Sequence, residues 1–124
     1  MQIRAPCGAA LDGFAEGWVI VIAPEGRYSV TGVLEEGSGG AAVIAYKSGA
    51  PILPIAITGT ENENVYGSLK KFRRAPVQVT VGKIFRLAGQ AESRQEAVSQ
   101  GTSQIMQALA DLLPEKYRGA YSSK

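Results

Sequence analysis

Five consecutive apolar residues, Trp18-Val19-Ile20-Val21-Ile22, constrain the fold of this chain more than any other feature. Four of the five are β-branched, and a continuous run of this kind is typical of a strand that is covered on both faces, as in a parallel sheet. The run ends at Ala23-Pro24. Because parallel α/β sheets carry ligand-binding residues where their strands end, we expect a buried strand followed by a functional turn.

A helix and a second apolar segment follow with the spacing of a parallel crossover. Ser38 is a candidate N-cap of the helix, and Gly49 and Pro51 are expected to end it. Residues 51–57 are nearly all apolar, with Pro54 predicting a local irregularity because proline cannot donate to a ladder. The pattern predicts a right-handed crossover and an α/β fold, with a mostly parallel sheet and flanking helices.

Three further elements are expected from periodicity and capping signals. Residues 8–16 predict a short helix closed by Gly17, and residues 77–81 alternate as a strand near a sheet edge with one wetter face. A capping box of Ser93 and Glu96 begins the last helix, which a proline ends. The helix is expected to be amphipathic, and the tail after it carries two aromatic residues able to dock back on the fold, Tyr117 and Tyr121.

Composition limits the classes of protein to which the chain can belong. Its 124 residues, 45% hydrophobic and 19% charged, predict one folded domain over residues 1–124. A net charge of +2 does not indicate a nucleic-acid partner, and the single cysteine, Cys7, excludes an internal disulfide and a cysteine-based metal site. We expect no cofactor and no metal. Without an apolar run of ~18 residues or a secretory signal, the sequence predicts a cytoplasmic protein or one bound at a membrane surface.

The turn Pro24-Glu25-Gly26-Arg27-Tyr28-Ser29 contains the groups that bind phosphate. The guanidinium of Arg27 can donate two hydrogen bonds to a phosphate, Ser29 adds a hydroxyl, and Gly26 leaves main-chain N–H groups accessible. Glu25 can hold the guanidinium or accept a hydrogen bond from a substrate hydroxyl. The alternative is that Glu25 and Arg27 only pair at a solvated turn, an interaction of ~1 kcal/mol or less.

A basic cluster lies in the long polar segment before the strand at 77–81. Lys70, Lys71, Arg73 and Arg74 surround Phe72. Such a cluster can meet an anionic phospholipid surface, with a gain of ~1 kcal/mol for each charge near the leaflet. It is equally consistent with a solvated loop, because short charge runs are usually surface features.

Three segments together resemble the C-terminal part of the glycerol-phosphate and lysophosphatidic acid acyltransferase family. Residues 22–29 are similar to the family's third block, usually Phe-Pro-Glu-Gly-Thr-Arg-Ser, and residues 37–42 to the glycine-rich helix start after it. Residues 51–57, followed by Thr58-Gly59-Thr60-Glu61, are similar to the fourth block. The similarity extends from about residue 18 to about residue 85. It implies the α/β fold of that family, N-terminally truncated.

The resemblance implies a role for each block. The third block would hold the phosphate of the acyl acceptor, and the fourth would shape the acyl-donor side. Arg27 stands where the family usually has threonine, and Tyr28 where it has arginine, so the guanidinium would approach the phosphate from a displaced position. The substrate-binding residues implied are Pro24, Glu25, Gly26, Arg27 and Ser29.

The family's first block, His-x-x-x-x-Asp, has no counterpart, because the chain contains no histidine. In the family this histidine deprotonates the acceptor hydroxyl, and the loss of a general base costs ~100- to 10,000-fold in rate. The resemblance implies a parent enzyme of phospholipid biosynthesis, acting at the inner face of the membrane. It would transfer a fatty acyl group from acyl-CoA or acyl carrier protein to 1-acylglycerol-3-phosphate or a related lysophospholipid.

No catalytic residue is therefore assigned within this chain, and we expect it to be inactive alone. Two other interpretations stay open. One is that the chain is a non-catalytic phosphate- or lipid-binding domain. The other is that it is a gene fragment whose apolar strands lack partners and promote aggregation.

Overall fold

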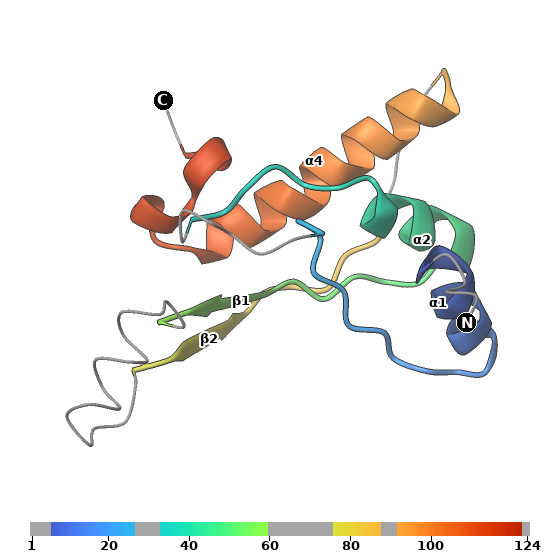
Figure 1. Cartoon of the computed structure of the whole chain (residues 1–124), viewed down its shortest axis with the longest axis horizontal. Coiled ribbons are helices and arrows are strands. Elements are labelled where there is room, and N and C mark those ends of the chain that lie inside the picture. The colour runs from blue at the N-terminus through green and yellow to red at the C-terminus, as the bar shows by residue number, and fades with distance from the viewer. Residues whose placement is uncertain (1–5, 27–32, 60–75, 88–91, 123–124) are drawn as a thin grey trace.

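The computed structural model of the chain describes residues 6–26, 33–59, 76–87 and 92–122. Its order of elements is α1 (Pro6–Ala15), α2 (Gly40–Ser48), β1 (Ile55–Thr58), β2 (Gln78–Val81), α4 (Arg94–Leu112), and the short 3-10 helices η1 (Glu115–Tyr117) and η2 (Gly119–Tyr121). Figure 1 shows the long α4 on one side, α2 against its first half, and the ribbon of β1 and β2 extending below its second half.

The core lies along the second half of α4. Met106 is fully buried and packs with four other buried residues from the segment before α2, from β1, and from α4 and its C-cap: Leu34, Ala56, Ala110 and Leu113. Tyr117 and Tyr121 of the C-terminal tail are partly buried against this cluster, so the prediction that the tail docks back is confirmed. Leu34 is held there because its N–H donates to the Tyr117 carbonyl at 2.8 Å.

The three α-helices of the described residues form where local signals predicted them. α1 is followed by Gly17, whose φ is +84°, and α2 by Gly49, which is left-handed and donates its N–H to the Ala45 carbonyl at 3.0 Å. Ser93 caps α4 by accepting from the Glu96 N–H at 3.2 Å. The N-cap of α2 is Gly39 rather than Ser38, whose hydroxyl instead accepts from the Gly40 N–H at 3.5 Å.

The predicted mostly parallel sheet is wrong. β1 pairs with β2 in antiparallel register, from Ile55 opposite Val81 to Thr58 opposite Gln78, and this is the sheet that the described residues form. Residues 18–22 lie outside it and are not a strand. They are not buried on both faces either, because Val19 is 91% and Val21 94% exposed. The expected parallel crossover between residues 18–22 and 51–57 is therefore absent from the described part of the chain.

The physical reason is a shortage of neighbours. A parallel strand is stable when other strands flank it and helices cover both faces of the sheet. Here α4 covers one face of the ribbon, and the antiparallel pairing of β1 with β2 needs no crossover. Residues 18–22 instead lie against α1, where a Cβ on Gly13 would be 3.0 Å from the Trp18 ring and 3.1 Å from Ile20 Cδ1.

The irregularity predicted at Pro54 is confirmed as a shift in register. Ile55 pairs with Val81, and the Pro54 carbonyl accepts from the Gly82 N–H at 2.9 Å. Continuing this register would place Ile52 opposite Ile84, yet Ile52 pairs with Phe85. The extra residue on the second segment forms a bulge next to the proline, which has no N–H to donate.

The ribbon exposes apolar side chains and buries smaller or more polar ones, which is the opposite of an amphipathic strand. Ala56 is buried toward the core and Thr80 is half-buried, whereas Ile55, Val79 and Val81 are exposed. The strand at 77–81 was expected to have one wetter face. Val79 and Val81 on one side are exposed, whereas on the other side Thr80 is half-buried and Gln78 is exposed.

Candidate functional site

The predicted binding turn is a tight turn closed by a main-chain hydrogen bond. The Gly26 N–H donates to the Ala23 carbonyl at 3.1 Å, and Gly26 has a φ of +70°. A Cβ at this position would lie 3.3 Å from the Ser38 Cβ. Glycine is favoured here both by the left-handed backbone and by the close approach of the chain.

Two hydrogen bonds hold the turn against the segment that leads into α2. The Ser38 N–H donates to the Pro24 carbonyl at 2.7 Å, and the Glu35 N–H donates to Glu25 Oε2 at 2.9 Å. Pro24 and Glu25 are both half-buried. The Glu25 carboxylate therefore has a structural role, because it accepts from the main chain ten residues away.

The glycine-rich segment before α2 brings this assembly close to α4. A Cβ on Gly37 would lie 2.6 Å from Met106 Cγ, and one on Gly39 would lie 2.9 Å from Val98 Cγ1. The Gly37 N–H also donates to the Tyr121 hydroxyl at 3.3 Å. The absence of a side chain at Gly37 and Gly39 therefore lets this segment lie close against α4.

The beginning of α2 lies beside the turn as a result. The hydrogen bond from Ser38 to Pro24 places the turn one residue from Gly39, the N-cap of α2. The first N–H groups of a helix lack intrahelical partners and carry a partial positive charge. This end of α2 therefore favours an anion near the turn.

Of the five predicted binding residues, the structure brings together Pro24, Glu25 and Gly26. Arg27 and Ser29 lie outside the described residues, as do Tyr28 and the basic cluster at 70–74. Sequence reasoning missed Glu35 and Ser38, which contact the turn through their N–H groups. Main-chain N–H donors cannot be recognised from the type of side chain.

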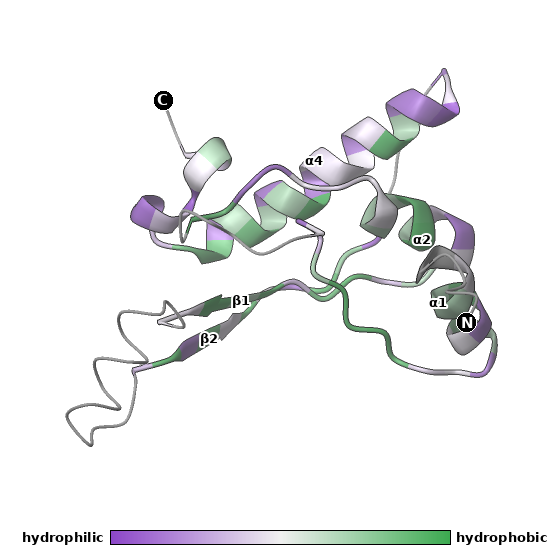
Figure 2. Ribbon diagram, viewed as in Figure 1, coloured by the Kyte–Doolittle hydropathy of each residue, from purple (hydrophilic) through white to green (hydrophobic). Residues whose placement is uncertain are grey.

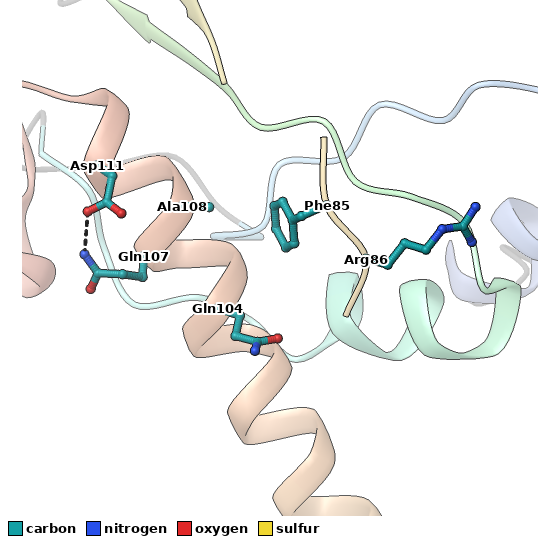
Figure 3. A pocket seen from close by; sticks show the side chains of 6 residues that line it. All are labelled: Phe85, Arg86, Gln104, Gln107, Ala108 and Asp111. Atoms are coloured by element: carbon teal, nitrogen blue, oxygen red, sulfur yellow. Dashed lines mark hydrogen bonds between the residues drawn. The ribbon is translucent and has the colours of Figure 1, made fainter. Parts of the chain in front are cut away.

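Two shallow hollows lie elsewhere on the surface. One, of about 330 Å³, is lined by Phe85, Arg86 and residues of α4. Figure 3 shows Arg86 extending away from α4, where it donates to the Gly49 carbonyl at 2.6 Å, while Gln107 donates to Asp111 at 2.9 Å. The other, of about 430 Å³, lies between α1 and α2. Neither is lined by Pro24, Glu25 or Gly26.

The described residues supply neither a metal cluster nor a membrane span. No three acidic, cysteine or histidine side chains in residues 6–26, 33–59, 76–87 and 92–122 come together as metal ligands. Over the same part of the chain, no helix combines the length and the apolar character needed to cross a bilayer.

Comparison with known proteins bears directly on the turn. Residues 8–58 match the family model described as Acyltransferase, a stretch that includes the turn and α2 and ends with β1. No solved structure matches the chain significantly. The match names acyltransferases as a class and does not single out those acting on lysophosphatidic acid or glycerol phosphate. The match supports a likeness to acyltransferases over residues 8–58, the segment that holds the candidate site.

Proposed function

We propose that residues 24–29 hold the phosphate of an acyl acceptor, as the acceptor-binding part of a phospholipid acyltransferase. The parent reaction transfers a fatty acyl group from acyl-CoA or acyl carrier protein to 1-acylglycerol-3-phosphate or a related lysophospholipid. The observation that carries the proposal is the 2.7 Å hydrogen bond from the Ser38 N–H to the Pro24 carbonyl. It fixes the turn beside the start of α2, within the segment that matches acyltransferases.

Electrostatics support a phosphate at this place. The N-terminal end of α2 favours negative charge, and Gly26 contributes a backbone without a side chain. Arg27 follows Gly26 directly in the sequence, and Ser29 is two residues further on. A guanidinium, a hydroxyl and main-chain N–H groups together can donate hydrogen bonds to the oxygens of a phosphate.

Acyl transfer requires both a site that binds the acceptor and a base that removes the proton of its hydroxyl. The acceptor hydroxyl attacks the thioester carbonyl, a new ester C–O bond forms, the C–S bond breaks, and the hydroxyl proton passes to a base. This chain has no histidine, and the Glu25 carboxylate is engaged with the Glu35 N–H. We therefore assign the chain acceptor binding and no catalytic residue, with the base supplied from outside these residues.

The acceptor's lipid character also suggests where binding occurs. A lysophospholipid resides at a bilayer surface, and the basic cluster at 70–74 has the composition that attracts an anionic leaflet. We place the protein at the cytoplasmic face of the membrane as a peripheral component. Nucleic acid is not a partner in this proposal.

The test is calorimetric titration of the chain with glycerol 3-phosphate, comparing Arg27→Ala with a matched control. Loss of the guanidinium should weaken binding about tenfold or more, since a hydrogen bond to a charged group contributes ~1.5–3 kcal/mol. Arg94→Ala removes the same charge from an exposed position at the start of α4 and should leave the affinity unchanged. Equal affinity of Arg27→Ala and the unaltered chain would contradict the proposal.

An acyl-transfer assay separates binding from catalysis. The chain incubated with palmitoyl-CoA and lysophosphatidic acid should release no thiol beyond the uncatalysed rate. Product that depends on both the thioester and the chain would show that the base lies within these residues, contrary to the assignment.

A further inference from the structure

The C-terminal tail, which we define as residues 114–122, is fixed to the end of α4. Arg118 Nε donates to the carbonyl of Leu113, the C-cap of α4, at 3.0 Å. The side chains of Tyr117 and Tyr121 pack against the core cluster. Figure 2 shows that α4 carries most of its hydrophobic residues in its second half, where the tail lies. The tail is therefore anchored to the best-packed part of the molecule.

The tail also holds the main chain of Leu34 by both of its polar groups. The Leu34 N–H donates to the Tyr117 carbonyl at 2.8 Å, and the Leu34 carbonyl accepts from the Ala120 N–H at 3.3 Å. The two segments approach so closely that a Cβ on Gly119 would overlap the Leu34 carbonyl oxygen. The tail thus fixes the beginning of residues 34–38, which we call the connecting segment.

A third contact holds the connecting segment further along and uses a side chain. The Gly37 N–H donates to the Tyr121 hydroxyl at 3.3 Å. Figure 1 shows the connecting segment running from the tail, along α4, to the start of α2. Because Tyr121 contributes its hydroxyl rather than a main-chain group, this contact depends on which residue occupies position 121.

The same connecting segment holds the candidate site. Its Glu35 N–H donates to Glu25 Oε2 at 2.9 Å, and its Ser38 N–H donates to the Pro24 carbonyl at 2.7 Å. Each of these two donors directly follows, in the sequence, an N–H that is bonded to the tail. A displacement of the connecting segment from the tail would therefore move the donors that hold the turn.

We propose that Tyr121 is a positioning residue for the phosphate-binding turn. Its hydroxyl keeps the connecting segment in the place from which Glu35 and Ser38 hold the turn through their N–H groups. The inference rests on the proposed function, and it adds a residue from the far end of the chain to that site. Tyr121 acts through the main chain of the connecting segment and is not assigned a contact with the acceptor.

The competing explanation is that Tyr121 only fills space. Its side chain is partly buried against the core cluster, and an aromatic ring without a hydroxyl would fill the same space. Tyr121→Phe separates the two explanations, because it keeps the ring and removes the acceptor of the Gly37 N–H.

The first readout is amide NMR spectroscopy of the full chain without ligand. In Tyr121→Phe the amide proton signals of Glu35 and Ser38 should move upfield, because their hydrogen bonds to the turn lengthen. A loss of overall stability alone would not move these signals, since they report the geometry of the folded state.

The second readout is calorimetric titration of the same variant with glycerol 3-phosphate. The dissociation constant should rise about two- to fivefold, since the loss of one hydrogen bond lowers the share of chains that hold the turn in place. A residue that only filled space would leave this constant unchanged when it is replaced by phenylalanine.

A matched control makes the same chemical change in α2. The Tyr46 hydroxyl is buried and has no hydrogen-bond partner among the described residues. Tyr46→Phe therefore removes a hydroxyl without breaking a contact to the connecting segment. The signals of Glu35 and Ser38 and the dissociation constant should stay as they are in the unaltered chain.

Three results would overturn the proposal. They are unchanged signals of Glu35 and Ser38 in Tyr121→Phe, equal changes in Tyr46→Phe, and an unaltered dissociation constant in Tyr121→Phe although the signals have moved. If the unaltered chain binds no glycerol 3-phosphate, the proposed function is wrong, whereas the amide signals still decide whether Tyr121 positions the turn.

Discussion

The two sides of the β1–β2 ribbon differ in what packs against them. On the side of α4, small residues such as Ala56 and Ala110 allow close contact, and Met106 is fully buried. On the other side, larger residues such as Ile57 and Val79 remain about half exposed. The close packing of α4 against small residues therefore stabilises the fold. The larger β-branched residues on the exposed side of the ribbon contribute little to its stability.

The largest expected effect tests the packed side directly. Met106→Ala should lower the free energy of unfolding by about 2–5 kcal/mol, because it leaves a cavity in the centre of the core. Val81→Ala removes an apolar side chain from the exposed side of the ribbon and should cost about 1 kcal/mol or less. Urea denaturation measures both. Equal losses would mean that the two sides are equally important.

A smaller effect is expected where the candidate site joins the packed side. Glu25→Ala removes the acceptor of the Glu35 N–H and should lower the free energy of unfolding by about 1–3 kcal/mol, as expected for a hydrogen bond to a charged group. Glu25→Gln keeps an oxygen acceptor and should lose less. Glu36→Ala, at an exposed neighbouring carboxylate, is the control in the same urea experiment. A Glu25→Ala variant as stable as Glu36→Ala would show that the turn is not held by its carboxylate.

The sequence predicted those parts of the fold that depend on local signals. The ends of α2 and α4 follow from Gly49 and from the pair Ser93 and Glu96, because each acts within one helical turn. The bulge beside Pro54 follows from the missing N–H of a single residue. The sheet was predicted wrongly because strand pairing is decided by distant partners, and residues 18–22 have the composition of a buried strand without the neighbours that would bury them.

The local turn of the candidate site was also predictable, whereas the contacts that hold it were not. Gly26 indicated a turn, and its positive φ confirms that a glycine is needed there. The contacts that fix the turn, from the N–H groups of Glu35 and Ser38, depend on the course of the chain rather than on side-chain type. The last helix was expected to be amphipathic, but the contact of Met106 with Gly37 depends on the three-dimensional arrangement.

The smallest expected effect concerns the beginning of α4, which Figure 1 shows projecting beyond the rest of the molecule. Residues 92–96 are exposed, so capping rather than burial must stabilise this end of the helix. Ser93→Ala removes the oxygen that accepts from the Glu96 N–H and should lower the free energy of unfolding by about 1 kcal/mol. Ser99→Ala makes the same chemical change at an exposed position inside α4 and should raise stability by a few tenths of a kcal/mol, since alanine has the higher helix propensity. Opposite signs in urea denaturation would show that the serine acts through its position at the cap. If both changes had the same sign, contacts with the core rather than the cap would stabilise this end of α4.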